Sequence, residues 1–231
     1  MPVTLRNVLT VAVYLLGAVT VVSGYSCTDR GQGTFTCRLD VVQDVWIESS
    51  TSNKDSYDYL IIAKHPSYPL KRTLMEFEDL QASSACTITD AYMYVYFAYA
   101  HKPSFQTIDE TPYLTHEVQL HVVNKSWLED EATTTKRYSG AYWSGTYLAL
   151  DGTDADSSVL TSETMPMGGP SRWVQFKVTD AVKDWDDGSV DNNGLLMKVE
   201  AESDEGRDLR FYSNSYTDDA SKHAYINVLC T

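Results

Sequence analysis

The sequence predicts an all-β fold: a jelly-roll β-sandwich with one short helix and a disulfide-bonded N-terminal extension. Three observations predict it. Several segments alternate apolar and polar residues with the period of two typical of strands, turn-forming residues separate them, and four cysteines follow an apolar leader. With 231 residues, 43% of them hydrophobic, the chain can bury one sizeable core. We therefore expect a signal peptide at 1–24, a cysteine-containing extension at 25–45 and one β-sandwich domain at 46–231.

The first segment has the features of a secretory signal peptide. Arg6 supplies a positive charge, and an apolar run from Val8 to Val22 follows it. Small or β-branched residues at Val22, Ser23 and Gly24 suit cleavage, and the run is short for the span of about 20 residues that crosses a membrane. An uncleaved anchor is the alternative. We expect a secreted, extracellular protein with no membrane span in its mature form.

The cysteines of the mature chain predict disulfide bonds. An even number in a secreted chain favours two bridges, and three pairings of Cys27, Cys37, Cys86 and Cys230 are open. Zinc is the weaker interpretation, because the chain has no CxxC pair and its five histidines are scattered. The tripeptide that begins at Asn124 is an N-glycosylation sequon, which predicts a glycoprotein with Asn124 in a surface loop.

The clearest strand runs from Ile88 to Phe97. One face would carry apolar residues toward the core, and the other would carry Tyr92, Tyr94 and Tyr96. The same alternation predicts further strands at Val118–Val122, Val174–Val178 and Ile226–Val228. The tripeptide Asn192-Asn193-Gly194 predicts a turn before another segment, Leu195–Val199.

One short helix is expected after the strand that ends at Val178. Thr179 and Asp180 would cap it, Ala181, Val182 and Trp185 would share a face, and Gly188 would end it. The segment 140–170 is rich in Gly, Ser, Thr and Asp, which predicts a long loop, and the acidic run 200–208 predicts a charged hairpin tip.

Several segments, in order along the chain, resemble the motifs of the DNRLRE family. They are Arg72–Leu80, Ile88–Tyr96, Ser126–Thr133, Trp173–Trp185, Asn193–Leu196 and Phe211–Ser213. DNRLRE domains are also grouped as family 96 carbohydrate-binding modules and resemble the TGF-β propeptide. The resemblance extends over about Trp46 to Val228, and the cysteine-bearing start is not part of it. It implies a jelly roll, a mostly non-catalytic extracellular role and glycan binding.

The tryptophans of these motifs are expected to be structural. Large aromatic rings dominate core burial, so Trp127, Trp173 and Trp185 are predicted to be core or loop-anchoring residues. Catalysis is not expected. His116 and His121 are five residues apart and do not match the HExxH zinc motif, and the chain contains no GxSxG, Walker or dinucleotide fingerprint. We therefore predict that the protein is not an enzyme.

Two groups of residues are candidate binding sites. Asp151, Asp154 and Asp156 offer carboxylates in one loop, which suits calcium, although a solvated acidic loop is the alternative. A second acidic group, around Gly188, is Asp184, Asp186, Asp187 and Asp191. The row Tyr92, Tyr94 and Tyr96 could stack against sugar rings, and the alternative is that a loop or the N-terminal extension covers it.

The net charge of the chain argues against some classes of partner. The formal net charge is −14, and removal of a leader containing Arg6 and no acid makes it one unit more negative. This argues against nucleic acids and anionic membranes as partners. We expect a secreted matrix or cell-surface structural or binding protein that binds an extracellular glycan or matrix component. The alternative is an acidic, calcium- or mineral-associated protein of a biomineralisation matrix, at a mineral surface. A propeptide-like partner of a signalling protein is a third, weaker interpretation.

Overall fold

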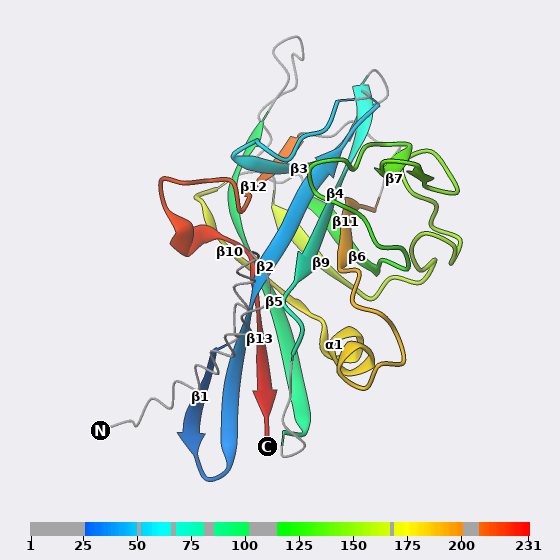
Figure 1. Ribbon diagram of the computed structural model, residues 1–231. Coiled ribbons are helices and arrows are strands. Elements are labelled where there is room, and N and C mark those ends of the chain that lie inside the picture. The colour runs from blue at the N-terminus through cyan, green and yellow to red at the C-terminus, as the bar shows by residue number, and fades with distance from the viewer. Residues whose placement is uncertain are drawn as a thin grey trace, which may run out of the picture.

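The computed structural model describes residues 26–49, 52–65, 68–80, 86–101, 115–166, 169–200 and 208–231 (Figure 1). Most of these residues form strands, and the all-β prediction with one short helix is confirmed. The strands are β1 (Ser26–Gly31), β2 (Thr34–Ile47), β3 (Tyr59–His65), β4 (Tyr68–Phe77), β5 (Ile88–His101), β6 (Thr115–Val122), β7 (Lys136–Tyr138), β8 (Ala141–Tyr142), β9 (Thr161–Pro166), β10 (Arg172–Lys177), β11 (Leu195–Val199), β12 (Asp208–Tyr212) and β13 (Tyr225–Cys230). The helices are α1 (Thr179–Asp186) and the 3-10 helix η1 (Ala220–Lys222). The predicted signal peptide lies outside the described residues.

Six strands close a hydrogen-bonded circuit. β2 pairs with β13 through its first half and with β4 through its second half, and the path β13-β5-β12-β3-β4 joins the two ends. β10 pairs with the other edge of β5, and β11, β6 and β9 continue the sheet beyond β4. In Figure 1 the long strands β2 and β5 run through both halves of the molecule. This circuit does not establish the jelly-roll sandwich, which stays a prediction, and the expected boundary at 45/46 falls inside β2.

The core lies on the inner face of β5. Ala91, Met93, Val95 and Phe97 are at most 1% exposed, so the predicted alternation is confirmed. Complete burial of each large apolar side chain stabilises the fold by about 1.5–3 kcal/mol. A second, smaller cluster surrounds Trp127, which is 2% exposed. The prediction that Trp127 is a core residue is therefore confirmed.

Two disulfides are present, as predicted. Cys27–Cys37 joins β1 to β2, and Cys86–Cys230 ties the end of β13 to Cys86, two residues before the start of β5. The second bridge closes the longer loop, so in the chain-entropy view it restricts the unfolded state more. Among the described residues, no helix is long and apolar enough to cross a membrane.

The predicted cap of α1 is wrong. The N-cap is Val178, and no side chain makes a capping hydrogen bond. Thr179 is buried instead, and its Oγ1 accepts a hydrogen bond from the Ala91 amide at 2.9 Å, so the hydroxyl serves the contact with β5. Asp180 lies in the first turn, where a negative charge suits the helix dipole. Gly188, at φ +75°, follows the C-cap as predicted.

Two further expectations concern loops. Gly194 adopts φ +81°, and a Cβ there would collide with the carbonyl oxygen of Met75, so the predicted turn requires glycine. The segment 140–170 is less irregular than predicted, because it contains β8 and β9. Among the residues that the structure describes, β9 pairs only with β6, and Met165 is its only buried residue, so its sequence lacks an apolar alternation. Most of the acidic run 200–208 lies outside the described residues.

Candidate functional site

Tyr92, Tyr94 and Tyr96 lie on the outer face of β5 and are half-buried. The pleat of the strand puts them opposite the core residues, as predicted. Tyr94 pairs with Tyr225 of β13, and their rings stack with centroids 5.0 Å apart. Tyr96 pairs with Trp173 of β10 on the other side. The tyrosine row is therefore the middle of a wider aromatic surface.

Trp173 lies across this surface. Its ring centroid is 5.1 Å from that of Tyr96 and 5.2 Å from that of Tyr225, with interplanar angles of 89° and 72°. β10 and β13 flank β5, and neighbouring strands are about 4.8 Å apart, so the indole must extend over β5 to reach Tyr225. It meets these rings, and that of Tyr94, nearly perpendicularly. Trp173 is nevertheless 38% exposed, so the prediction of a core or loop-anchoring residue is wrong.

The surface continues onto β12 and β3. The Tyr212 ring lies 5.8 Å from Tyr96 and 5.3 Å from Tyr59, and Tyr59 lies 5.5 Å from Tyr99. Tyr216 covers Tyr212 at 4.1 Å. We define the aromatic face as Tyr59, Tyr92, Tyr94, Tyr96, Tyr99, Trp173, Tyr212, Tyr216 and Tyr225. Sequence reasoning missed most of it, although alternation with Phe211 and Ile226 was a usable signal that Tyr212 and Tyr225 point outward.

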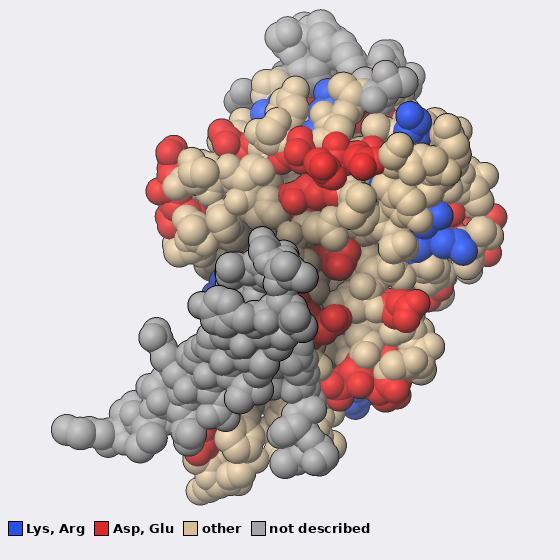
Figure 2. Space-filling model, in the orientation of Figure 1, with Lys and Arg blue, Asp and Glu red and all other residues tan. Residues whose placement is uncertain are grey.

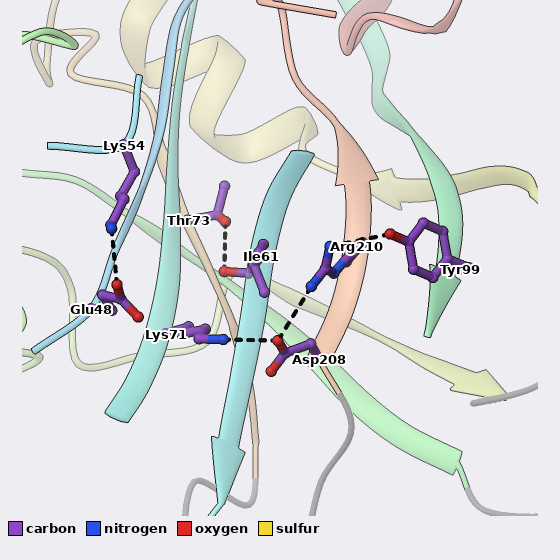
Figure 3. Close-up of polar contacts among 8 residues, drawn as sticks. All are labelled: Glu48, Lys54, Ile61, Lys71, Thr73, Tyr99, Asp208 and Arg210. Atoms are coloured by element: carbon purple, nitrogen blue, oxygen red, sulfur yellow. Dashed lines mark hydrogen bonds and ion pairs between the residues drawn. The ribbon is translucent and has the colours of Figure 1, made fainter. Parts of the chain in front are cut away.

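Basic side chains lie over these rings. The Arg38 guanidinium is 3.9 Å from the centroid of Tyr225, and Lys222 Nζ is 4.9 Å from that of Tyr212. Such contacts stabilise by about 0.5–1 kcal/mol at exposed sites. Figure 3 shows another of these cations, Arg210, which donates to the Tyr99 hydroxyl and faces the carboxylate of Asp208.

Three tyrosine hydroxyls of the aromatic face have raised pKa values. Burial, the largest cause, raises the pKa of Tyr59, Tyr212 and Tyr225 above the ordinary tyrosine value. These three tyrosines therefore present neutral hydroxyl groups at neutral pH, beside the paired charges.

A hollow of about 480 Å³ opens beside the aromatic face, between β9 and β10. Tyr92 and Trp173 line both the hollow and the face, and Gln175, Lys177 and Glu163 add polar groups. Small-molecule sites commonly measure about 300–1,000 Å³. The hollow and the exposed indole thus form one continuous surface with aromatic and hydrogen-bonding parts.

The three aspartates predicted to bind calcium have separate roles. Asp154 is 1% exposed, and its carboxylate accepts hydrogen bonds from the amides of Ser144 and Ala149 and from the Ser144 hydroxyl. Burial raises the pKa of Asp154, but hydrogen bonds from Ala149 and Ser144 outweigh it and lower the pKa overall. Asp156 accepts from the side chain of Asn124, and Asp151 from the amide of Thr153. Within the described ranges, no group of three His, Cys, Asp or Glu could hold a metal ion, so the calcium prediction has no geometric support here.

The sequon side chain is also engaged. Asn124 Nδ2 donates to the carbonyl oxygen of Gly152 at 3.1 Å and to Asp156 Oδ1 at 2.8 Å. Asn124 is half-buried, and its own amide donates to the carbonyl oxygen of Asp154. Asn124 directly follows Val123, which forms a β-bridge with Ala155. The side chain that would carry a glycan therefore holds the loop residues Gly152 and Asp156 in place.

Acidic residues gather elsewhere on the molecule. Figure 2 shows a band of Asp and Glu that descends over the region of β2 and β4 toward α1, with few Lys or Arg between them. Gln43 of β2 donates to Glu76 Oε2 of β4 at 3.0 Å, and the Asp44 amide of β2 donates to Oε1 of Glu129, between β6 and β7, at 3.0 Å. Burial, and then the charge of Asp79, raises the pKa of Glu76 to about 7. Burial also raises the pKa of Asp44 and Glu129.

The second predicted acidic group surrounds the end of α1. Asp184, Asp186, Asp187 and Asp191 are all exposed. Asp187 Oδ1 accepts from the Ser189 amide at 2.8 Å, a local turn contact. These side chains form a solvated acidic surface.

The chain matches no known protein-family model, and a search of curated proteins finds no match for it. The resemblance to the DNRLRE family therefore stays a prediction that rests on the motifs.

Proposed function

We propose that this protein is a secreted, non-catalytic glycan-binding component of an extracellular matrix or cell-surface layer. The aromatic face is its binding site, and Trp173 is the ring on which a sugar stacks. The observation that carries this proposal is the exposed indole of Trp173, held nearly perpendicular to the rings of Tyr94, Tyr96 and Tyr225.

The chemistry of the face suits a sugar ring. A pyranose presents C–H groups on its faces and hydroxyl groups at its rim, so it stacks on an aromatic ring while its rim forms hydrogen bonds. Around Trp173, the side chains of Gln175 and Lys177 and the tyrosine hydroxyls supply those partners. The hollow between β9 and β10 gives space for further sugar units beside the indole.

The site is also preorganised. Its rings come from strands β3, β5, β10, β12 and β13, together with Tyr216, and they contact one another before any ligand arrives. Rings fixed in this way lose little conformational entropy when a ligand binds. The two disulfides suit an oxidising, extracellular environment, and the DNRLRE resemblance adds independent support for glycan binding.

One observation favours a second candidate, an acidic mineral- or calcium-associated matrix protein. It is the acidic band of Figure 2, which is separate from the contacts that build the aromatic face. A negatively charged surface of this kind could contact the cations of a mineral.

The two candidates predict different results in one depletion assay. Protein secreted from cells that express the full chain is mixed with insoluble polysaccharides or with calcium carbonate, each with calcium or with chelator. We expect retention on at least one polysaccharide and a loss of at least tenfold in the Trp173→Ala variant. The matched control is Tyr142→Ala, because Tyr142 is 62% exposed and lies on β8, outside the aromatic face.

Retention on calcium carbonate alone, unchanged in Trp173→Ala, would overturn glycan binding in favour of the acidic surface. Retention on neither material would contradict both candidates.

A further inference from the structure

The aromatic face has a charge balance that differs from that of the whole molecule. We propose that its ligand is an uncharged polysaccharide, and that the charged side chains of the face hydrogen-bond sugar hydroxyls instead of neutralising sulfate or carboxylate groups. This inference rests on the proposed glycan binding and narrows it to a class of polymer.

The cations over the rings lie next to carboxylates. Arg38 Nε is 2.6 Å from Asp40, Lys177 Nζ is 2.9 Å from Asp90, and Lys222 Nζ is 3.4 Å from Asp219. The pattern therefore recurs on β2, on β10 and at η1, at separate places around the face.

Arg210, which lies over Tyr59 and Tyr99, shares its carboxylate with a second cation. Figure 3 shows Asp208 between Lys71, at 2.8 Å, and Arg210, at 3.9 Å. At the one-to-one pairs of Arg38, Lys177 and Lys222, a polyanion would have to compete with a carboxylate for the positive charge.

The hollow is no better suited to binding a polyanion. Arg172 lines it, but its guanidinium donates to the carbonyl oxygens of Pro170 and Pro166, at 3.2 and 3.4 Å. Glu163 adds a negative charge to the same hollow.

The rest of the molecule repels polyanions. The chain has a formal net charge of −14, and unscreened fields extend over the Debye length, about 8 Å at physiological ionic strength. An uncharged polymer feels no such repulsion. It can use both members of each pair, because the cation donates to a hydroxyl oxygen and the carboxylate accepts from a hydroxyl group.

Polymers that share a backbone but differ in charge test this inference. Suitable pairs are hydroxyethylcellulose with carboxymethylcellulose, and agarose with carrageenan. Migration of the secreted protein through native gels that contain each polymer gives an affinity, and a sodium chloride series in the matching pull-down gives its salt dependence. We expect retardation by an uncharged polymer that changes less than twofold with salt, and at least tenfold weaker retardation by its charged counterpart.

A variant that uncovers one cation provides the matched control. Asp219→Asn leaves Lys222 over its tyrosines without the carboxylate, and asparagine can keep the hydrogen bond from the Ser221 amide that caps η1. We expect this variant to gain at least threefold in affinity for carboxymethylcellulose or carrageenan, and the gain to disappear at high salt.

The possible outcomes distinguish the charge of the ligand from glycan binding itself. Binding to charged polymers that weakens with salt and is lost in Trp173→Ala would overturn the uncharged ligand while leaving glycan binding in place. Binding to no polymer in either charge class would overturn the proposed function itself.

Discussion

The aromatic face and the acidic loop 151–156 hold their charged groups in different ways. On the aromatic face, cations lie over rings and beside carboxylates, as Arg38 does with Tyr225 and Asp40. In the loop 151–156, carboxylates accept hydrogen bonds from amides, as Asp154 does from Ser144 and Ala149. Residue type alone therefore does not mark a binding site. A group whose hydrogen bonds are satisfied inside the fold has little left to offer a ligand.

The largest expected effect tests the internal role of Asp154. Replacement by alanine leaves several buried N–H groups without an acceptor, so the free energy of unfolding should fall by about 3–5 kcal/mol. Urea denaturation monitored by circular dichroism measures it. The control, Asp151→Ala, removes an exposed carboxylate and should change stability by about 0.5 kcal/mol or less. A small loss of stability in Asp154→Ala, with stabilisation of the wild type by added calcium, would instead identify this loop as a metal site.

The next effect concerns Glu76, whose pKa is raised from 4.5 to about 7. Because the folded state holds this proton more tightly than the unfolded state, stability falls as pH rises from 4.5 to about 7. Asp44 and Glu129, whose pKa values are also raised, act in the same direction. Glu76→Gln should reduce the loss of folding stability between pH 5 and pH 8 by about 1–3 kcal/mol.

Denaturant midpoints at both pH values measure this difference. The exposed Glu163→Gln carries the same charge change and should keep the pH dependence of the wild type. An equally steep pH dependence in Glu76→Gln would show that Glu76 does not contribute to it.

A further prediction concerns the contribution of Trp173, on the aromatic face, to stability. The indole is 38% exposed, so Trp173→Ala should lose only the edge contacts to its tyrosine neighbours, about 1–2 kcal/mol. The melting temperature should therefore fall slightly while glycan retention is lost. A loss of stability as large as that of Asp154→Ala would identify Trp173 as a structural residue and remove the main support for the binding site.

Much of this fold could be predicted from the sequence, because alternation reports which side of a strand is buried. The alternation of β5 correctly placed Tyr92, Tyr94 and Tyr96 outside. The alternation of β10 also indicated that Trp173 points outward, since Val174 and Phe176 alternate with Gln175, but the prediction followed the general tendency of large aromatic rings to be buried. The roles of Asp154 and Thr179 could not be predicted, because their partners Ser144, Ala149 and Ala91 come together only after the chain folds.

The smallest expected effect concerns Asn124, which fastens the Asp154 loop through two hydrogen bonds. Asn124→Ala should lower stability by about 1 kcal/mol, because neutral hydrogen bonds contribute modestly. Glycosylation replaces one of the two hydrogens on Nδ2, so a glycosylated Asn124 can keep only one of these bonds. We therefore expect protein expressed through a secretory pathway to carry little glycan at Asn124, and intact-mass measurement before and after glycosidase treatment checks this. Full occupancy with unchanged stability would mean that the structure of the loop 151–156 does not depend on this side chain. The loop would then be held by weaker contacts than the rings of the aromatic face.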